Sequence, residues 1–146
     1  MHRFVSIFAV VALALTFGTS FATQSRKSTH ATAIGGYCPV AYVAMNKAVK
    51  GDPKFSSTAD GHRYLFSNTD AKKMFEMDPA KYQVAYDGWC ATALAMGKKI
   101  KSDPKLFTLH GGRTYLFSTA DAKKGFDDMP DGIIQKADAQ WAAVKK

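Results

Sequence analysis

The sequence predicts an α+β fold built from two copies of one short unit, because most of the chain is written twice. Each copy opens with glycine, an aromatic residue and cysteine. It continues through Asp-Pro-Lys, a glycine, Tyr-Leu-Phe-Ser and Asp-Ala-Lys-Lys, and the matched segments are offset by 51 residues. Because the first copy has one extra residue near Val43, Cys38 and Cys90 are separated by 52 positions instead of 51. Because each copy alone is too short to bury a core, we expect two pseudo-symmetric units in a single domain.

A short helix is expected directly after each cysteine. Pro39 suits the first helical position, where its missing N–H costs nothing, so Cys38 is expected at the N-cap. The two predicted helices are Pro39 to about Asn46 and Ala91 to about Gly97.

Each copy then predicts a β-hairpin, because Asp-Pro disfavours helix and alternating apolar residues flank a glycine turn. The predicted strands are Phe55–Ala59 with His62–Phe66, and Leu106–Leu109 with Arg113–Phe117. We expect the two hairpins to share one small antiparallel sheet covered by the short helices.

Helices are also predicted after each hairpin and at the end of the chain. Capping-box-like segments precede Thr69–Met77 and Ala120–Asp128. The last predicted helix, Ile133–Val144, places its apolar residues Ile133, Ile134, Ala137 and Trp141 on one face.

The first 22 residues predict an export signal. A short basic start precedes an apolar run and small residues ending at Ala22, and the run is too short to span a membrane. An alternative cleavage point follows Ala33. We therefore expect a periplasmic or secreted protein with a disordered leader at 23–34 and one domain at 35–146, divided into units of about 36–87 and 88–146.

The chain is basic, with a formal net charge of +8. Its lysines are spread in pairs over both copies without an arginine-rich stripe, so we predict no nucleic-acid binding, and a solubilising surface that can attract anionic envelope surfaces. P-loop, dinucleotide, zinc-protease and serine-hydrolase motifs are missing. A binding role is therefore favoured over an enzymatic one.

Five segments together resemble the YHS domain family, and within it small exported members with two tandem units. They are Gly36-Tyr37-Cys38-Pro39-Val40-Ala41-Tyr42, Lys47-Ala48-Val49-Lys50-Gly51, Tyr64-Leu65-Phe66, Asp78-Pro79-Ala80-Lys81-Tyr82 and Gly88-Trp89-Cys90-Ala91. Relatives carry Asp, Cys or selenocysteine at the place of Cys38, so this chain resembles the thiol-bearing branch. The resemblance implies a metal- or redox-linked module and transfers no enzymatic activity.

The cysteine pair supports three functional hypotheses. Two thiolates suit a soft metal, so our leading prediction is a copper site with Cys38 and Cys90 as ligands. The same pair could instead be catalytic in thiol/disulfide redox chemistry with a small thiol or oxidant, Cys38 attacking first. The third hypothesis is an envelope interaction module stapled by a Cys38–Cys90 disulfide, and two unpaired, buried, inert thiols are the remaining alternative. All three depend on the duplication bringing the two sulfur atoms together.

Other soft or imidazole ligands fit less well. Met45 and Met96 occupy equivalent places two helical turns after the cysteines, where core packing is the expected use and metal ligation the alternative. Tyr37 and Trp89 are expected to pack around the cysteines or in the ordinary core. The histidines His62 and His110 occupy non-equivalent places at hairpin turns and are expected in solvent, so neither is a candidate ligand.

Overall fold

The computed structural model describes residues 30–145, and the predicted signal peptide at 1–22 lies outside them. Within the described part of the chain, no helix has the length and apolar character needed to cross a bilayer.

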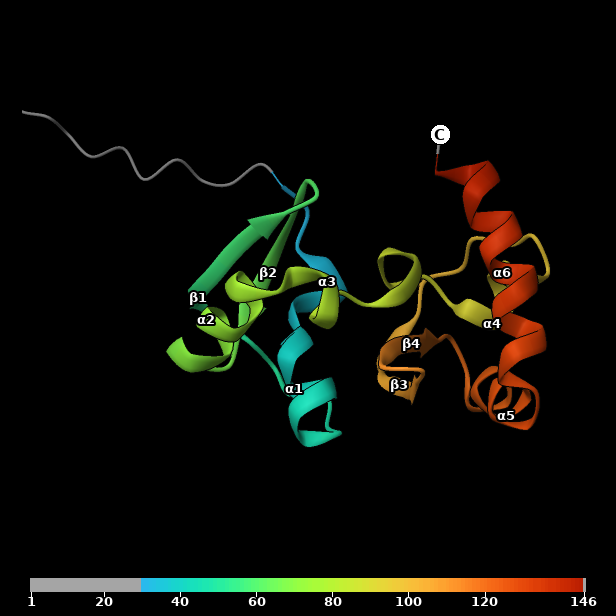
Figure 1. Cartoon of the computed structure of the whole chain (residues 1–146), viewed down its shortest axis with the longest axis horizontal. Coiled ribbons are helices and arrows are strands. Elements are labelled where there is room, and N and C mark those ends of the chain that lie inside the picture. Colours follow the sequence, from blue (N-terminus) through green and yellow to red (C-terminus); the bar gives the residue numbers. More distant parts are fainter. Residues whose placement is uncertain (1–29, 146) are drawn as a thin grey trace, which may run out of the picture.

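The predicted α+β class is confirmed, and the same order of elements occurs twice (Figure 1). The first unit contains the 3-10 turn η1 (Ala33–Gly36), α1 (Pro39–Met45), β1 (Asp52–Ala59), β2 (His62–Phe66), α2 (Thr69–Met77) and α3 (Pro79–Tyr82). The second contains the 3-10 turn η2 (Ala85–Gly88), α4 (Ala91–Ala95), β3 (Asp103–His110), β4 (Arg113–Phe117), α5 (Ala120–Asp128) and α6 (Pro130–Val144). Because η2 repeats η1, the second unit begins near Ala85, a little before the predicted boundary.

The prediction of one shared sheet is wrong, since each hairpin forms its own two-stranded antiparallel sheet. The outer edges of the hairpins are occupied locally. Thr32 bridges Arg63 of β2 in parallel, and Cys90 bridges Leu116 of β4 in the same way. At the β2 and β4 edges these bridges take the place that a strand of the other hairpin would occupy.

The ordered domain begins earlier than residue 35. The backbone N–H of Arg63 donates to the carbonyl of Ala31 at 3.0 Å, and Ala33 and Ile34 are buried. The predicted disordered leader is therefore wrong for residues 31–34, whose backbone pairs with β2, while 23–29 lies outside the described residues.

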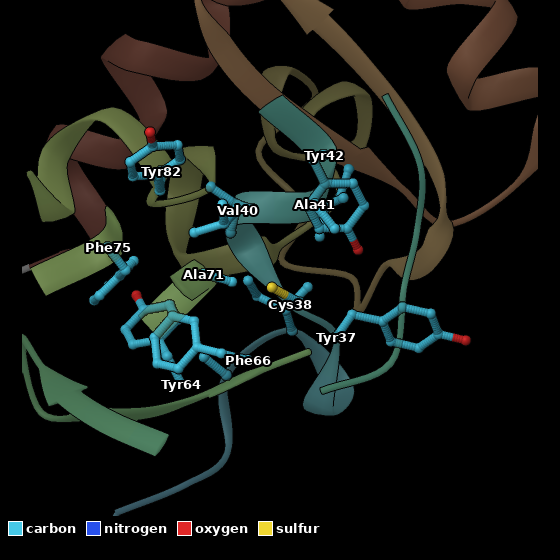
Figure 2. Close-up of a cluster of buried hydrophobic side chains, with 14 residues drawn as sticks. Tyr37, Cys38, Val40, Ala41, Tyr42, Tyr64, Phe66, Ala71, Phe75 and Tyr82 are labelled. Carbon is cyan, nitrogen blue, oxygen red and sulfur yellow. The ribbon is translucent and has the colours of Figure 1, made fainter. Parts of the chain in front are cut away.

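Each unit has its own hydrophobic core. In the first, Phe75 of α2 packs with its ring centroid 4.8 Å from Tyr64 and 5.1 Å from Phe66 (Figure 2). In the second, Phe126 of α5 lies 4.9 Å from Tyr115 and 5.0 Å from Phe117. The repeated Tyr-Leu-Phe strand and the phenylalanine that follows it thus build the same helix-on-hairpin layer twice.

The two units contact each other at a junction formed by α1, β4 and the two 3-10 turns. Tyr42 of α1 donates its hydroxyl to the carbonyl of Pro104 at 2.7 Å and packs edge-on against Phe107 at 4.8 Å. Leu116 of β4 is fully buried and belongs to the first unit's core. The equivalent turns η1 and η2 also contact each other, as an approximate two-fold axis would require.

Buried tyrosines predict a loss of stability at alkaline pH. Burial, aided by Asp87 and Asp60, raises the pKa of Tyr64 to about 12, and burial is also the main reason that the pKa values of Tyr42 and Tyr86 are raised. The unfolded chain ionises its phenols near pH 10, so the stabilising contribution is complete below that pH and is lost as pH rises through about 12. Denaturant unfolding across this range, followed together with phenolate absorbance, checks the prediction. Titration of every tyrosine in the folded protein near pH 10 would contradict it.

Candidate functional site

The two thiols occupy the predicted helix starts. Cys38 is the N-cap of α1 and Cys90 the N-cap of α4. Both side chains are fully buried, at 0% exposure, and both cysteines are free.

The prediction that the duplication brings sulfur to sulfur is wrong. Cys38 belongs to the first core and Cys90 to the second. In Figure 1 the helices that begin at these cysteines, α1 and α4, lie on opposite sides of the junction. Each helix packs on its own hairpin, so each cysteine faces the core of its own unit. Both cysteines are free, so no disulfide joins them in this structure.

Each thiol instead contacts a serine of its own unit. Ser118 Oγ donates to Cys90 Sγ at 3.4 Å, and Ser67 Oγ approaches Cys38 Sγ at 3.8 Å. Cys90 Sγ also accepts from the backbone N–H of Ala93 at 3.5 Å, so this sulfur caps its helix. These serines end the repeated Tyr-Leu-Phe-Ser segment, a signal that was visible in the sequence. These contacts give each buried sulfur a hydrogen-bond partner within its own unit. They favour a structural role for both cysteines.

A cleft of about 400 Å³ lies where the two units meet. It is lined by Ala31, Thr32, Ala33, Ile34, Gly35 and His62 of the first unit and by Asp87, Gly88, Trp89, Lys101, Ser102 and Pro104 of the second. Neither unit forms this cleft alone, and the cleft was not predictable from the repeated motifs.

Two strained turns form part of the cleft wall. In η1 the chain has positive φ at Ile34 (54°) and at both glycines that follow. In η2 it has positive φ at Tyr86 (55°), Asp87 (51°) and Gly88. Left-handed backbone is uncommon outside glycine and is a clear outlier for a β-branched residue such as Ile34. The same strain at equivalent places marks this junction as the candidate site, because strained backbone concentrates where function requires a particular geometry.

The polar groups of the cleft come mainly from the second unit. The backbone of Lys101 bridges that of Trp89, and Ser102 Oγ donates to the carbonyl of Gly88, which ties the strained turn to the segment before β3. Lys99 Nζ lies 4.8 Å from the centre of the Trp89 ring. Trp89 is half-buried and lines the cleft together with Lys101.

Two further ionisable groups lie at the cleft. His62 is half-buried, and its Nδ1 lies 3.0 Å from the carbonyl oxygen of Asp60, which leaves Nε2 as the nitrogen that can meet a ligand. Asp87 is exposed at the strained turn. The expectation of a purely solvated His62 is therefore corrected: it lines the cleft. His110 is paired with Asp131 at 3.0 Å, outside the cleft.

Metal ligation has little geometric support. Among residues 30–145 no group of three or more His, Cys, Asp or Glu side chains could hold a metal ion. Cys38 and Cys90 lie in separate buried cores. Copper binding thus stays a prediction from the sequence.

Comparison with known proteins gave no match: no family model, no curated protein and no solved structure matches this chain. The resemblance to the YHS family stays a prediction.

Proposed function

We propose that this protein is a non-enzymatic binding module that holds a small planar anion in the cleft between its two units. The observation that carries the proposal is the cleft itself, built jointly by both units at their equivalent strained turns. Its volume falls within the range of small-molecule sites.

Charge supports an anionic ligand. The chain carries a net charge of +8, and Lys101 lines the cleft with its ammonium group exposed on a flexible stem. A carboxylate, sulfonate or phosphate on the ligand would gain a charge-assisted hydrogen bond there. His62 Nε2 offers a second polar contact from the first unit.

Trp89 supports a planar ligand. Indole rings provide a large amphipathic surface on which a flat ring can stack. The neighbouring lining residues Ile34 and Pro104 continue the apolar wall. Asp87 can accept a hydrogen bond from an N–H or O–H donor on the ligand, which would add specificity.

The thiol hypotheses are less well supported. Copper binding or disulfide exchange by Cys38 and Cys90 needs the sulfurs to be accessible or adjacent, and both are fully buried in separate cores. Within our proposal the thiols are core groups, and the module acts in the periplasm or after secretion, as residues 1–22 predict.

Anilinonaphthalene sulfonate, an aromatic anion with a planar naphthalene ring, is a suitable probe for the cleft. In a Trp141→Phe background Trp89 is the remaining tryptophan, so its quenching reports binding at the cleft. Lys101→Gln is expected to weaken binding about tenfold, the usual order for one hydrogen bond to a charged group.

Lys54→Gln is the matched control, because it removes the same charge from an exposed lysine on β1 outside the cleft. It should leave the affinity within about twofold of the parent, as expected for a distant, screened charge. Equal weakening by both variants, or binding without a change in Trp89 emission, would reject the cleft as the site.

A further inference from the structure

Four methionines lie on the surface, where methionine is uncommon. Met45 is 51% exposed, Met77 79%, Met96 65% and Met129 63%. The expectation that Met45 and Met96 pack in the core is wrong, because α1 ends at Met45 and α4 ends just before Met96, beyond the buried face of each helix. Since methionine is normally among the more buried residue types, repeated exposure requires a reason other than packing.

The exposed methionines lie at the ends of equivalent helices in the two units. Met45 is the last residue of α1, and Met96 is the C-cap of α4. Met77 is the last residue of α2, and Met129 is the C-cap of α5. The duplicated fold therefore presents two thioethers per unit at helix ends, where they add little to either core.

The remaining sulfur atoms of the described chain are sheltered. Met74 is half-buried and packs against the first core, while Cys38 and Cys90 have no exposed surface. A dissolved oxidant thus meets four thioethers before it meets a thiol or a core methionine.

We propose that Met45, Met77, Met96 and Met129 are oxidation sites that take up oxygen from peroxide-type oxidants while the fold and the two thiols are preserved. In each event a sulfur lone pair attacks one oxygen of hydrogen peroxide, an S–O bond forms and the O–O bond breaks. The sulfur is oxidised by two electrons to a sulfoxide, and the departing hydroxide takes the proton from the transferred oxygen and leaves as water. The modification is reversible, because methionine sulfoxide reductases restore the thioether.

The fold explains why these four sites tolerate the change. A sulfoxide is polar, and at an exposed helix end water solvates its oxygen. At Met74 the same group would enter an apolar core and disrupt packing. Oxidation of the surface set is therefore expected to leave the unfolding midpoint unchanged.

The test treats the folded protein with hydrogen peroxide and follows intact mass, peptide maps and free thiols. We expect the peptides that cover residues 30–145 to gain four oxygens, about 16 Da each, located at the four exposed methionines, with both thiols still titratable. Treatment of the oxidised protein with methionine sulfoxide reductases A and B should restore the original mass. Met74 should react at a comparable rate only after the chain is unfolded in denaturant.

Two variants make the experiment decisive. Substituting leucine at all four exposed positions should abolish oxygen uptake in the peptides that cover residues 30–145 at the same dose, whereas Met74→Leu should take up the same four oxygens there as the parent. Oxidation of Met74 as fast as the surface set in the folded protein would overturn the proposal. So would loss of either thiol first, or unfolding on uptake of the four oxygens.

Discussion

Phe126→Ala is expected to lower the free energy of unfolding by about 3–5 kcal/mol, the range for removing a fully buried aromatic ring. The ring is 0% exposed and fills the centre of the second core. It contacts Tyr115 and Phe117 and meets the edge of His110 at 6.2 Å, so it ties α5 to both strands of its hairpin. Urea unfolding followed by circular dichroism measures the change.

Phe75→Ala is the matched variant in the first unit, because Phe75 is also buried between a tyrosine and a phenylalanine. A similar loss of stability is expected. Thiol labelling then separates the two cores: Phe126→Ala should speed the labelling of Cys90, and Phe75→Ala that of Cys38. A stability change below about 1 kcal/mol would contradict the packing described above.

Gly51→Ala is expected to cost about 3 kcal/mol, at the upper end for forcing extra atoms into a packed site. A Cβ at Gly51 would lie 2.5 Å from both the carbonyl carbon and the Cβ of Leu65. The segment cannot easily move away, because Gly51 N–H donates to the carbonyl of Gly36 at 2.8 Å. The expected loss of stability is therefore steric, and denaturant unfolding measures it.

Gly125→Ala is the control for this substitution. Gly125 lies inside α5, and a Cβ there would meet no atom within 4 Å. Alanine is the better helix former, so a gain of up to about 1 kcal/mol is expected. If both alanine variants were equally neutral, the close approach of Gly51 to Leu65 would not exist in the folded protein.

The helices and strands were predictable because their signals are local. The structure has helices at Thr69–Met77 and Ala120–Asp128, with the predicted bounds. Asn68 and Thr119 cap them by accepting from backbone N–H groups three residues later. Capping and turn preferences depend on residues that are close in the chain, so a single sequence is enough to predict where these helices begin and end.

The candidate site was predictable only in part. Cys38 and Cys90 stand at their helix N-caps as expected, but the cleft beside Trp89 and His62 was missed. One signal was present, since glycine followed by an aromatic residue opens both units. The other half of the cleft, contributed by residues 31–35 and His62, depends on how the first unit meets the second.

The sequence by itself determined the duplication, the α+β class, the bounds of the helices Thr69–Met77 and Ala120–Asp128 and the capping cysteines, because these follow from repeated motifs and local backbone preferences. Only the tertiary structure decided that the hairpins form separate sheets, that each sulfur stays in its own core and that methionines reach the surface. These outcomes depend on which edges and faces pack across the junction, where Tyr42 meets Pro104 and η1 meets η2. Such contacts join residues far apart in the chain, and periodicity and spacing do not specify them.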